Sequence, residues 1–258
     1  MRHRHQQPIS TQTVRRRLHA LGMRSRSARK KSLLLPSHCR RRLQWAIAHR
    51  NWRLAQWKHC MFTDEVRVVL ARGDDRIRMW RRRGEPRHAE ILVNRVEQMG
   101  GGGEMFWGGI TFDGKTQLVR VNGSMNERKY IDEILDNHVI PYRNGLPRAE
   151  RAGFILVDDN APAHRAHIVR DHLARNRITR MDPWPAKSPD MNCVEPCWSY
   201  TKLIVNRKIK PGDDKNALCR YVTQAWNRMP MRYVRNLIRS MRRRVQALIA
   251  ANGGNTDY

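Results

Sequence analysis

The first acidic residue of this 258-residue chain is Asp64, and this limits what the N-terminal quarter can form. Residues 1–63 carry 16 Lys and Arg and no Asp or Glu. Residues 64–195 are nearly balanced, with 22 basic and 20 acidic residues, whereas residues 196–258 hold 13 basic and 3 acidic residues. Arms of like charge repel themselves, which disfavours a compact form unless a polyanion neutralises them. The pattern predicts a folded, nearly neutral centre between two polyanion-binding arms.

The composition argues against a secreted disulfide scaffold, a membrane protein and a disordered acidic chain. Hydrophobic residues make up 40% of the chain, enough for a real core, yet no uncharged apolar run approaches the roughly 18 residues of a membrane span. The start, MRHRHQQPIS, lacks the apolar region of a secretory signal, and the five scattered cysteines form no disulfide framework. With a net charge of +28, the expected partner is nucleic acid, bound in a steeply salt-dependent way.

A short basic helix is predicted near the N-terminus. Ser10 is a good N-cap, Val14, Leu18 and Leu21 recur at helical spacing, and Gly22 stands where the helix would end. The segment 24–31 is basic without apolar periodicity, which predicts a linker that either follows phosphates or serves as a nuclear-import signal. The candidate DNA-binding residues are Arg15, Arg16, Arg17, Arg24, Arg26, Arg29, Lys30 and Lys31.

Beyond residue 36 the apolar pattern predicts a mixed α/β layer with helices on its faces. Strands are predicted at 59–62, 66–70, 77–80, 104–112, 117–121, 154–157 and 178–181. Helices are predicted at 37–49, 125–138, 163–174, 193–209, 214–228 and 231–250. The residues of these helices that are expected to face inward are Leu43, Ala46, Ile47, Ile168, Val169 and Leu173.

Three acidic positions stand where elements begin or end. Asp64 follows one apolar run, Asp158 and Asp159 follow another, and Glu195 lies in the first turn of a predicted helix. If the two strands are parallel neighbours, their carboxylates share one sheet edge, and a helix across that edge brings in Glu195. Clustered carboxylates repel unless a cation compensates them, and Mg²⁺ prefers such oxygen ligands. A pair of metal ions in such a site activates water or a 3′-hydroxyl for attack on a phosphodiester.

Each of these residues also has a purely structural interpretation. Asp64 ends a strand in a turn, Asp158–Asp159–Asn160 forms an Asx turn, and Asn192 with Glu195 forms a capping box. Taken singly, these interpretations are favoured. The catalytic interpretation gains weight because the three positions share a chain with two basic arms.

Four further features carry alternatives. His164 either orients a phosphate or metal-bound water, or is a surface residue of a helix start. Trp184 is expected to pack in the core, with DNA contact as the alternative, and the run Arg242–Arg244 is expected on a solvated helix face, with phosphate contact as the alternative. Cys193 and Cys197 flank Glu195, but no second pair of metal ligands supports a zinc site.

The chain resembles transposases of the Tc/mariner superfamily. The resemblance lies in WKHCMFTDE (57–65), MFWGGI (105–110), DNAPAH (159–164) and WPAKSPDMNCVEPCW (184–198), in family order. The segment ISTQTVRRRLHALGMRSRSARKK resembles the last helix of the family's second helix-turn-helix with its linker. On this resemblance the chain is expected to begin inside the second DNA-binding subdomain.

The resemblance implies an α/β fold with a ribonuclease-H-like mixed sheet flanked by helices, a small N-terminal helix-turn-helix remnant and a helical C-terminus. The expected domains are residues 1–23, the remnant; 24–56, a basic linker and helix; and 57–258, the catalytic domain. It also implies catalytic, metal-binding residues Asp64, Asp159 and Glu195, with Mg²⁺ or Mn²⁺ as cofactor.

The expected function is cut-and-paste DNA transposition, through metal-dependent hydrolysis and strand transfer at terminal inverted repeats. The expected partners are double-stranded DNA and a second copy of the chain, without a membrane, and the expected location is the nucleus. One alternative is a catalytically inactive DNA-binding protein of transposon origin that acts by occupancy. Another is a ribonuclease-H-type nuclease or resolvase, which would share the triad but need no recognition helix.

Overall fold

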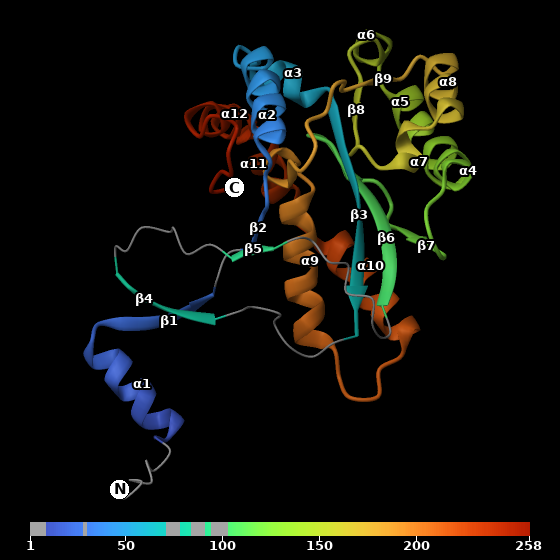
Figure 1. The fold of residues 1–258 in the computed structure, drawn as a ribbon. Helices are drawn as coiled ribbons and strands as arrows, with labels where there is room; N and C mark the ends of the chain where they lie inside the picture. Colours follow the sequence, from blue (N-terminus) through green and yellow to red (C-terminus); the bar gives the residue numbers. More distant parts are fainter. Residues whose placement is uncertain (1–8, 28–29, 71–77, 84–90, 94–102) are drawn as a thin grey trace, which may run out of the picture. The chain divides into compact units, whose positions relative to one another are not determined.

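The computed structural model of the protein describes residues 9–27, 30–70, 78–83, 91–93 and 103–258 (Figure 1). It contains two compact units. Residues 1–33 and 73–97 form the smaller unit, and residues 34–72 and 98–258 form the larger one. The predicted domain boundaries after residues 23 and 56 stay a prediction.

The smaller unit combines the N-terminal basic arm with a segment from the middle of the chain. It contains α1 (Thr11–Ala20), β1 (Met23–Ser27), β2 (Lys30–Ser32), β4 (Arg78–Arg82) and β5 (Ile91–Val93). β1 pairs with β4 in antiparallel fashion, and β2 pairs with β5 in parallel. Within the predicted linker at 24–31, the structure places strand residues of β1 and β2 that the sequence analysis did not predict. Apart from Met23, these strands consist of Arg, Lys and Ser and carry no apolar signal, and their partners lie about 50 to 60 residues away in the chain.

Helix α1 forms where the sequence predicts it. The Ser10 hydroxyl accepts a hydrogen bond from the backbone N of Thr13 at 3.2 Å, which confirms the N-cap. The apolar residues of this helix are less buried than their helical spacing predicts: Val14 and Leu21 are exposed, and Leu18 is half-buried. The ring of His19 meets that of Trp80 edge to face at 5.2 Å, which joins α1 to β4.

The larger unit is built on a five-stranded mixed sheet of order β7-β6-β3-β8-β9 (Figure 1). The strands are β3 (Cys60–Val69), β6 (Gly103–Ile110), β7 (Val119–Val121), β8 (Ile155–Val157) and β9 (Thr179–Arg180). β3 runs antiparallel to β6 and parallel to β8, and β8 runs parallel to β9. The two strands predicted at 59–62 and 66–70 are thus one continuous strand.

Helices cover both faces of this sheet. Because side chains alternate along a strand, Phe62 and Phe106 belong to one core cluster, while their neighbours Met61 and Trp107 belong to the other. The first cluster packs the sheet against the C-terminal helices, and the second packs it against the helices that precede β8 and β9. The helices of the unit are α2 (Pro36–Ala48), α3 (Leu54–Lys58), α4 (Glu127–Lys129), the π-helix η1 (Tyr130–Val139), α5 (Ile140–Gly145), α6 (Arg148–Arg151), α7 (Pro162–Arg165), α8 (His167–Arg175), the 3₁₀ helix η2 (Pro189–Met191), α9 (Glu195–Lys208), α10 (Lys215–Arg228), α11 (Met231–Arg239) and α12 (Met241–Ala250).

Two predicted core positions are wrong, and both lie on correctly predicted helices. Ile47 of α2 is 42% exposed and Ile168 of α8 is 39% exposed, whereas Ala46, Val169 and Leu173 are buried as expected. In α2 the buried face instead holds Trp45 and Arg42, a charged residue that a pattern of apolar spacing cannot select. The helix predicted at 231–250 is divided at Ser240 into α11 and α12.

None of the helices in the described part of the chain is both long and apolar enough to cross a membrane.

Candidate active site

Asp64 lies within β3 and not at its end, so its turn interpretation is wrong. The parallel pairing of β3 with β8 stops at Phe62 and Val157, while the antiparallel pairing with β6 continues to Val69. The apolar runs in the sequence end where the parallel part ends: Asp158 directly follows Val157, and Asp64 lies two residues after Phe62. The expectation that the carboxylates share one sheet edge rests on this parallel pairing, and the pairing is confirmed.

The side chain of Asp64 shares a face of the sheet with Gly108, its cross-strand partner on β6. A Cβ on Gly108 would lie 2.9 Å from the Trp198 ring of α9 and 3.0 Å from the Trp226 ring of α10. This face therefore points at α9 and α10, and the figure shows α9 running alongside β3 (Figure 1). Asp64 is directed toward the helix that begins with Glu195.

Glu195 is the first residue of α9, and it is not part of a capping box. The N-cap of α9 is Val194, and the side chain of Asn192 makes other contacts. The Asn192 amide donates to the backbone O of Thr63 at 3.1 Å, and its Oδ1 accepts from the N of Val194 at 3.3 Å. Asn192 thereby ties the start of α9 to β3, one residue before Asp64.

Asp158 and Asp159 are adjacent in sequence but differ in surroundings. Asp158 is 2% exposed; its Oδ2 accepts a hydrogen bond from the Tyr130 hydroxyl at 2.9 Å and lies 3.1 Å from Nη2 of Arg180. Burial raises the pKa of Asp158, against the opposing charge of Arg180. Asp158 is thus a buried structural carboxylate whose counter-charge is Arg180, while Asp159 is exposed in the turn after β8.

Asp159 forms the expected Asx turn and also contacts a histidine. Its Oδ1 accepts from the backbone N of Ala161 at 2.8 Å and lies 2.8 Å from Nδ1 of His164. The side chain is partly buried, which raises its pKa, but the hydrogen bond and charge of His164 outweigh this and lower the pKa. Both hydrogen bonds go to Oδ1, so Oδ2 is the atom through which Asp159 can bind a ligand.

His164 is buried, 2% exposed, and not a surface residue. Its Nε2 lies 3.3 Å from Oε1 of Glu65 on β3, and its ring packs at 4.1 Å from the Tyr130 ring. Burial lowers the pKa of His164, but Asp159 and Glu65 together raise it to about 10. A protonated imidazole therefore bridges β3 and the turn after β8 at neutral pH.

The pKa of Asp64 is raised well above its ordinary value. Burial is the first cause, and the negative charges of Glu195, Glu65 and Asp159 follow. These interactions place all three predicted site residues in one electrostatic neighbourhood. Because carboxylates dominate this neighbourhood, a bound cation would stabilise the ionised form of Asp64.

The donor set at this edge fits a divalent metal ion in its chemistry. Asp64, Asp159 and Glu195 offer only carboxylate oxygens, the ligands that Mg²⁺ prefers. Among the residues that the structure describes, no three carboxylate, His or Cys side chains lie close enough to hold one metal ion together. The carboxylates are thus gathered at one sheet edge without being closed into a coordination sphere.

The structure decides two predictions near the site: the core position of Trp184 is confirmed, and the expected exposure of the run Arg242–Arg244 needs correction. Trp184 is 6% exposed and meets the Trp45 ring edge to face at 5.3 Å, so it is a core residue and not a DNA contact. Its backbone O accepts a hydrogen bond from the Asn160 amide at 2.7 Å, which fixes the chain beside Asp159. In the run Arg242–Arg244, Arg242 and Arg243 are exposed as expected, but Arg244 is buried.

The predicted DNA-binding residues belong to the smaller unit. Arg15, Arg16 and Arg17 are exposed on α1, and Arg24 and Arg26 are exposed on β1. Lys30 and Lys31 lie in β2, and Arg29 lies outside the described residues.

Sequence reasoning missed the residues that surround the carboxylates. Glu65, Tyr130 and Arg180 come from separate elements and carry no spacing that connects them with Asp158 or Asp159. Asn192 lies inside the segment 184–198 that resembles the family, and this resemblance was the one signal in the sequence that could have pointed to it.

Comparison with known proteins agrees with this geometry. A family described as "Transposase" matches residues 1–51, and one described as "DDE superfamily endonuclease" matches residues 59–217. The chain is 32% identical over 251 residues to the Tc1 transposase of Caenorhabditis elegans and 31% identical over 252 residues to the Tcb1 transposase of Caenorhabditis briggsae. Each alignment covers 96% of this chain and 88% of the relative.

Solved structures show the same fold. A pre-cleavage Mos1 transpososome superposes with a TM-score of 0.69 at 17% identity, over 96% of this chain and 72% of that one. The Mos1 transposase catalytic domain with Raltegravir and Mg superposes with a TM-score of 0.65 at 14% identity, over 87% of this chain and all of that one. The expected ribonuclease-H-like fold is confirmed, and the chain belongs to the Tc1/mariner family of DNA transposases.

Proposed function

We propose that the larger unit cuts and joins DNA by metal-dependent phosphodiester chemistry, with Asp64, Asp159 and Glu195 as the metal ligands. One observation supports this most strongly. Asp64 is a half-buried carboxylate on the central strand, and the charges that raise its pKa, after desolvation, are those of other carboxylates, foremost Glu195. A protein maintains such repulsion where a cation binds, because the ion converts it into attraction.

The metal ions that these residues would hold are Mg²⁺ or Mn²⁺. When bound, such ions would activate a water or a 3′-hydroxyl for attack and stabilise the leaving oxygen. Asp64 provides a carboxylate from a rigid strand, and Glu195 provides one from the first turn of α9. Asp159 contributes Oδ2, because His164 and Ala161 hold Oδ1 and fix the plane of the carboxylate. His164 also neutralises part of the negative charge, which limits the repulsion in the site before metal arrives.

The substrate is double-stranded DNA at terminal inverted repeats, and the basic smaller unit binds it. Exposed arginines on α1 and β1 support this, since guanidinium groups contact phosphates and release counterions. Two ends must be brought together for cut-and-paste transposition, so we propose that a homodimer acts, in the nucleus. The alternative of a DNA-binding protein without chemistry leaves the gathered carboxylates unexplained.

The test uses the full chain and linear duplexes made from the DNA that flanks its coding sequence. We expect cleavage at the repeat ends with Mg²⁺ or Mn²⁺ and none with EDTA. Glu195→Gln should reduce the cleavage rate by about a thousandfold or more while leaving DNA binding intact. Glu150→Gln is the matched control, because Glu150 is exposed on α6. DNA binding without metal-dependent cleavage by the wild-type chain would favour action by occupancy.

A further inference from the structure

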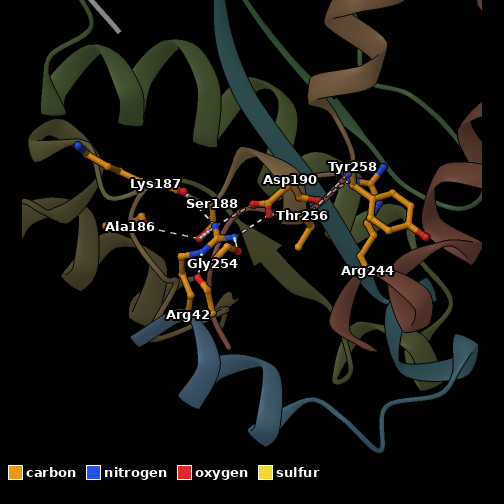
Figure 2. Close-up of polar contacts among 10 residues, drawn as sticks. Arg42, Ala186, Lys187, Ser188, Asp190, Arg244, Gly254, Thr256 and Tyr258 are labelled. Atoms are coloured by element: carbon orange, nitrogen blue, oxygen red, sulfur yellow. Dashed lines mark hydrogen bonds and ion pairs between the residues drawn. The ribbon is translucent and has the colours of Figure 1, made fainter. Parts of the chain in front are cut away.

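A charged residue with no exposed surface lies in α2, away from the carboxylates of the site. Arg42 is 0% exposed, and all of its guanidinium nitrogens are engaged. Nη1 and Nη2 hold Oδ1 and Oδ2 of Asp190 at 2.8 and 2.6 Å, in a two-pronged ion pair (Figure 2). Nη1 also donates to the backbone O of Lys187 at 3.0 Å and to Oγ of Ser188 at 2.9 Å.

The C-terminal tail closes over this pair. Arg42 donates from Nε to the backbone O of Gly253 at 2.8 Å and from Nη2 to the backbone O of Gly254 at 3.0 Å. The Thr256 hydroxyl donates to Oδ2 of Asp190 at 2.8 Å, and Thr256 is itself 7% exposed (Figure 2). The tail therefore completes the shell of hydrogen bonds around a buried ion pair.

Helix α12 contributes a second arginine. Arg244 donates from Nη1 to the backbone O of Asp190 at 2.5 Å and from Nε to Oγ of Ser240 at 2.9 Å. Its guanidinium also lies 4.9 Å from the centre of the Tyr258 ring. Asp190 is thus held through its carboxylate by α2 and the tail, and through its backbone by α12.

The approach of the tail to α2 requires glycine at position 253. Gly253 has a φ of +77°, and a Cβ there would lie 1.9 Å from the backbone O of Cys39 and 2.7 Å from its carbonyl carbon. Backbone atoms of a helix cannot yield by that distance. Any larger residue at position 253 must displace the tail from α2.

Asp190 is connected to Glu195, a proposed metal ligand, by a short segment whose backbone is held by hydrogen bonds. Asp190 lies in η2, where the backbone N of Met191 donates to Ser188 O and that of Asn192 donates to Pro189 O. Asn192 then binds β3 through Thr63 O, and the N of Glu195 donates to Asn192 O at 3.3 Å. A displacement of Asp190 is therefore transmitted to Glu195, since this segment has few ways to absorb it.

We propose that Arg42 is a positioning residue: with the C-terminal tail as its cover, it fixes Asp190 and thereby sets where Glu195 stands relative to Asp64. This inference rests on the proposed function, in which Glu195 is a metal ligand. A contribution to stability alone is a weaker explanation, because desolvation of two buried charges largely cancels their attraction. A buried ion pair such as Arg42–Asp190 is better explained by a role in selecting one conformation of the chain over others.

The first pair of variants perturbs the tail or its control position and leaves every charged group in place. Gly253→Ala forces the tail off α2, and Gly212→Ala is the matched control, since Gly212 has a φ of +86° with open space around it. Both variants carry the same backbone strain of an alanine at positive φ. Arg42→Gln removes the ion pair itself, and Arg42→Lys tests whether charge without the two-pronged geometry restores the effect.

Two readouts are measured on the full chain without DNA. We expect Gly253→Ala and Arg42→Gln to speed hydrogen exchange at the amides of Met191, Asn192 and Glu195, and to weaken Mn²⁺ binding about tenfold. Gly212→Ala should change neither, and Arg42→Lys should restore little of the loss. Unchanged exchange at these amides in Gly253→Ala would overturn the inference. So would faster exchange with undiminished Mn²⁺ affinity.

Glu195→Gln separates this inference from the proposed function. If Glu195→Gln binds Mn²⁺ as tightly as the wild-type chain, Glu195 is not a metal ligand and the proposed function fails. Hydrogen exchange needs no metal, so it still decides whether Arg42 and the tail control the segment before α9.

Discussion

Nδ1 of His164 lies 2.8 Å from Oδ1 of Asp159, while its Nε2 lies 3.3 Å from Oε1 of Glu65, so one imidazole joins the turn after β8 to the central strand. Because the pKa of His164 is raised to about 10, this link is a charged one at neutral pH. The neighbouring carboxylate, Asp158, is paired instead with Arg180 and Tyr130. Two adjacent aspartates thus have separate tasks, one at the site and one in the core.

This separation predicts different effects of substitution at the two positions. Asp159→Ala should lower the rate of metal-dependent cleavage by about a thousandfold or more and leave salt-sensitive DNA binding intact. Asp158→Asn should instead lower the free energy of unfolding by about 3 kcal/mol, since it leaves Arg180 without its buried counter-charge. Cleavage assays and chemical denaturation distinguish the two. Equal loss of stability in both variants would contradict the assignment of Asp159 to the site.

The contact between Gly108 and two tryptophans predicts a packing defect at the site. In Gly108→Ala the new Cβ would lie 2.9 Å from Trp198 and 3.0 Å from Trp226, and both rings are buried. Overpacking of this kind costs about 1–3 kcal/mol and should push α9 away from Asp64. Gly114→Ala is the control, because its nearest neighbour is 3.9 Å away. Thermal unfolding measures the difference, and equal midpoints in the two variants would show that α9 yields without cost.

Much of the larger unit was predictable because its strands and helices carry their own apolar patterns. The spacing of residues 154–157 and 163–174 identifies β8 and the helices after it, and the positions of Asp64, Asp159 and Glu195 follow from those elements. The interior position of Asp64 in β3 was not predictable, because it depends on the antiparallel partner β6, whose pairing extends to Val69.

Charged residues in the interior account for most of what the sequence concealed. Arg42, Asp190 and Arg244 look like surface residues by composition, and only the fold brings their partners together from α2, η2, α12 and the tail. The strands of the smaller unit were hidden for a related reason. Backbone hydrogen bonds to a distant segment define β1 and β2, and arginine and serine side chains give no sign of them.

The burial of three cysteines predicts a graded reaction with thiol reagents. Burial raises the pKa of Cys193 to about 12 and raises the pKa of Cys60 and Cys197 further. The thiolate is the reactive form, so these three should resist iodoacetamide at pH 8, while the half-buried Cys39 and Cys219 are labelled first. Mass spectrometry of peptides from the native chain checks this, with full labelling in denaturant as the control. Rapid labelling of Cys193 would show that the segment before Glu195 opens readily.

The exposed arginines of α1 predict how binding depends on salt. Replacing Arg15, Arg16 and Arg17 by Gln should weaken binding to duplex DNA and lower the slope of log affinity against log salt by up to about 3, since each lost phosphate contact removes about 0.9. The matched control replaces Arg232, Arg242 and Arg243, which are exposed on α11 and α12. Both triple variants lose the same charge, so a smaller change in slope for the control shows that α1 contacts phosphates directly. Equal changes would mean that only net charge matters, and an unchanged slope in the α1 variant would mean that DNA binds elsewhere.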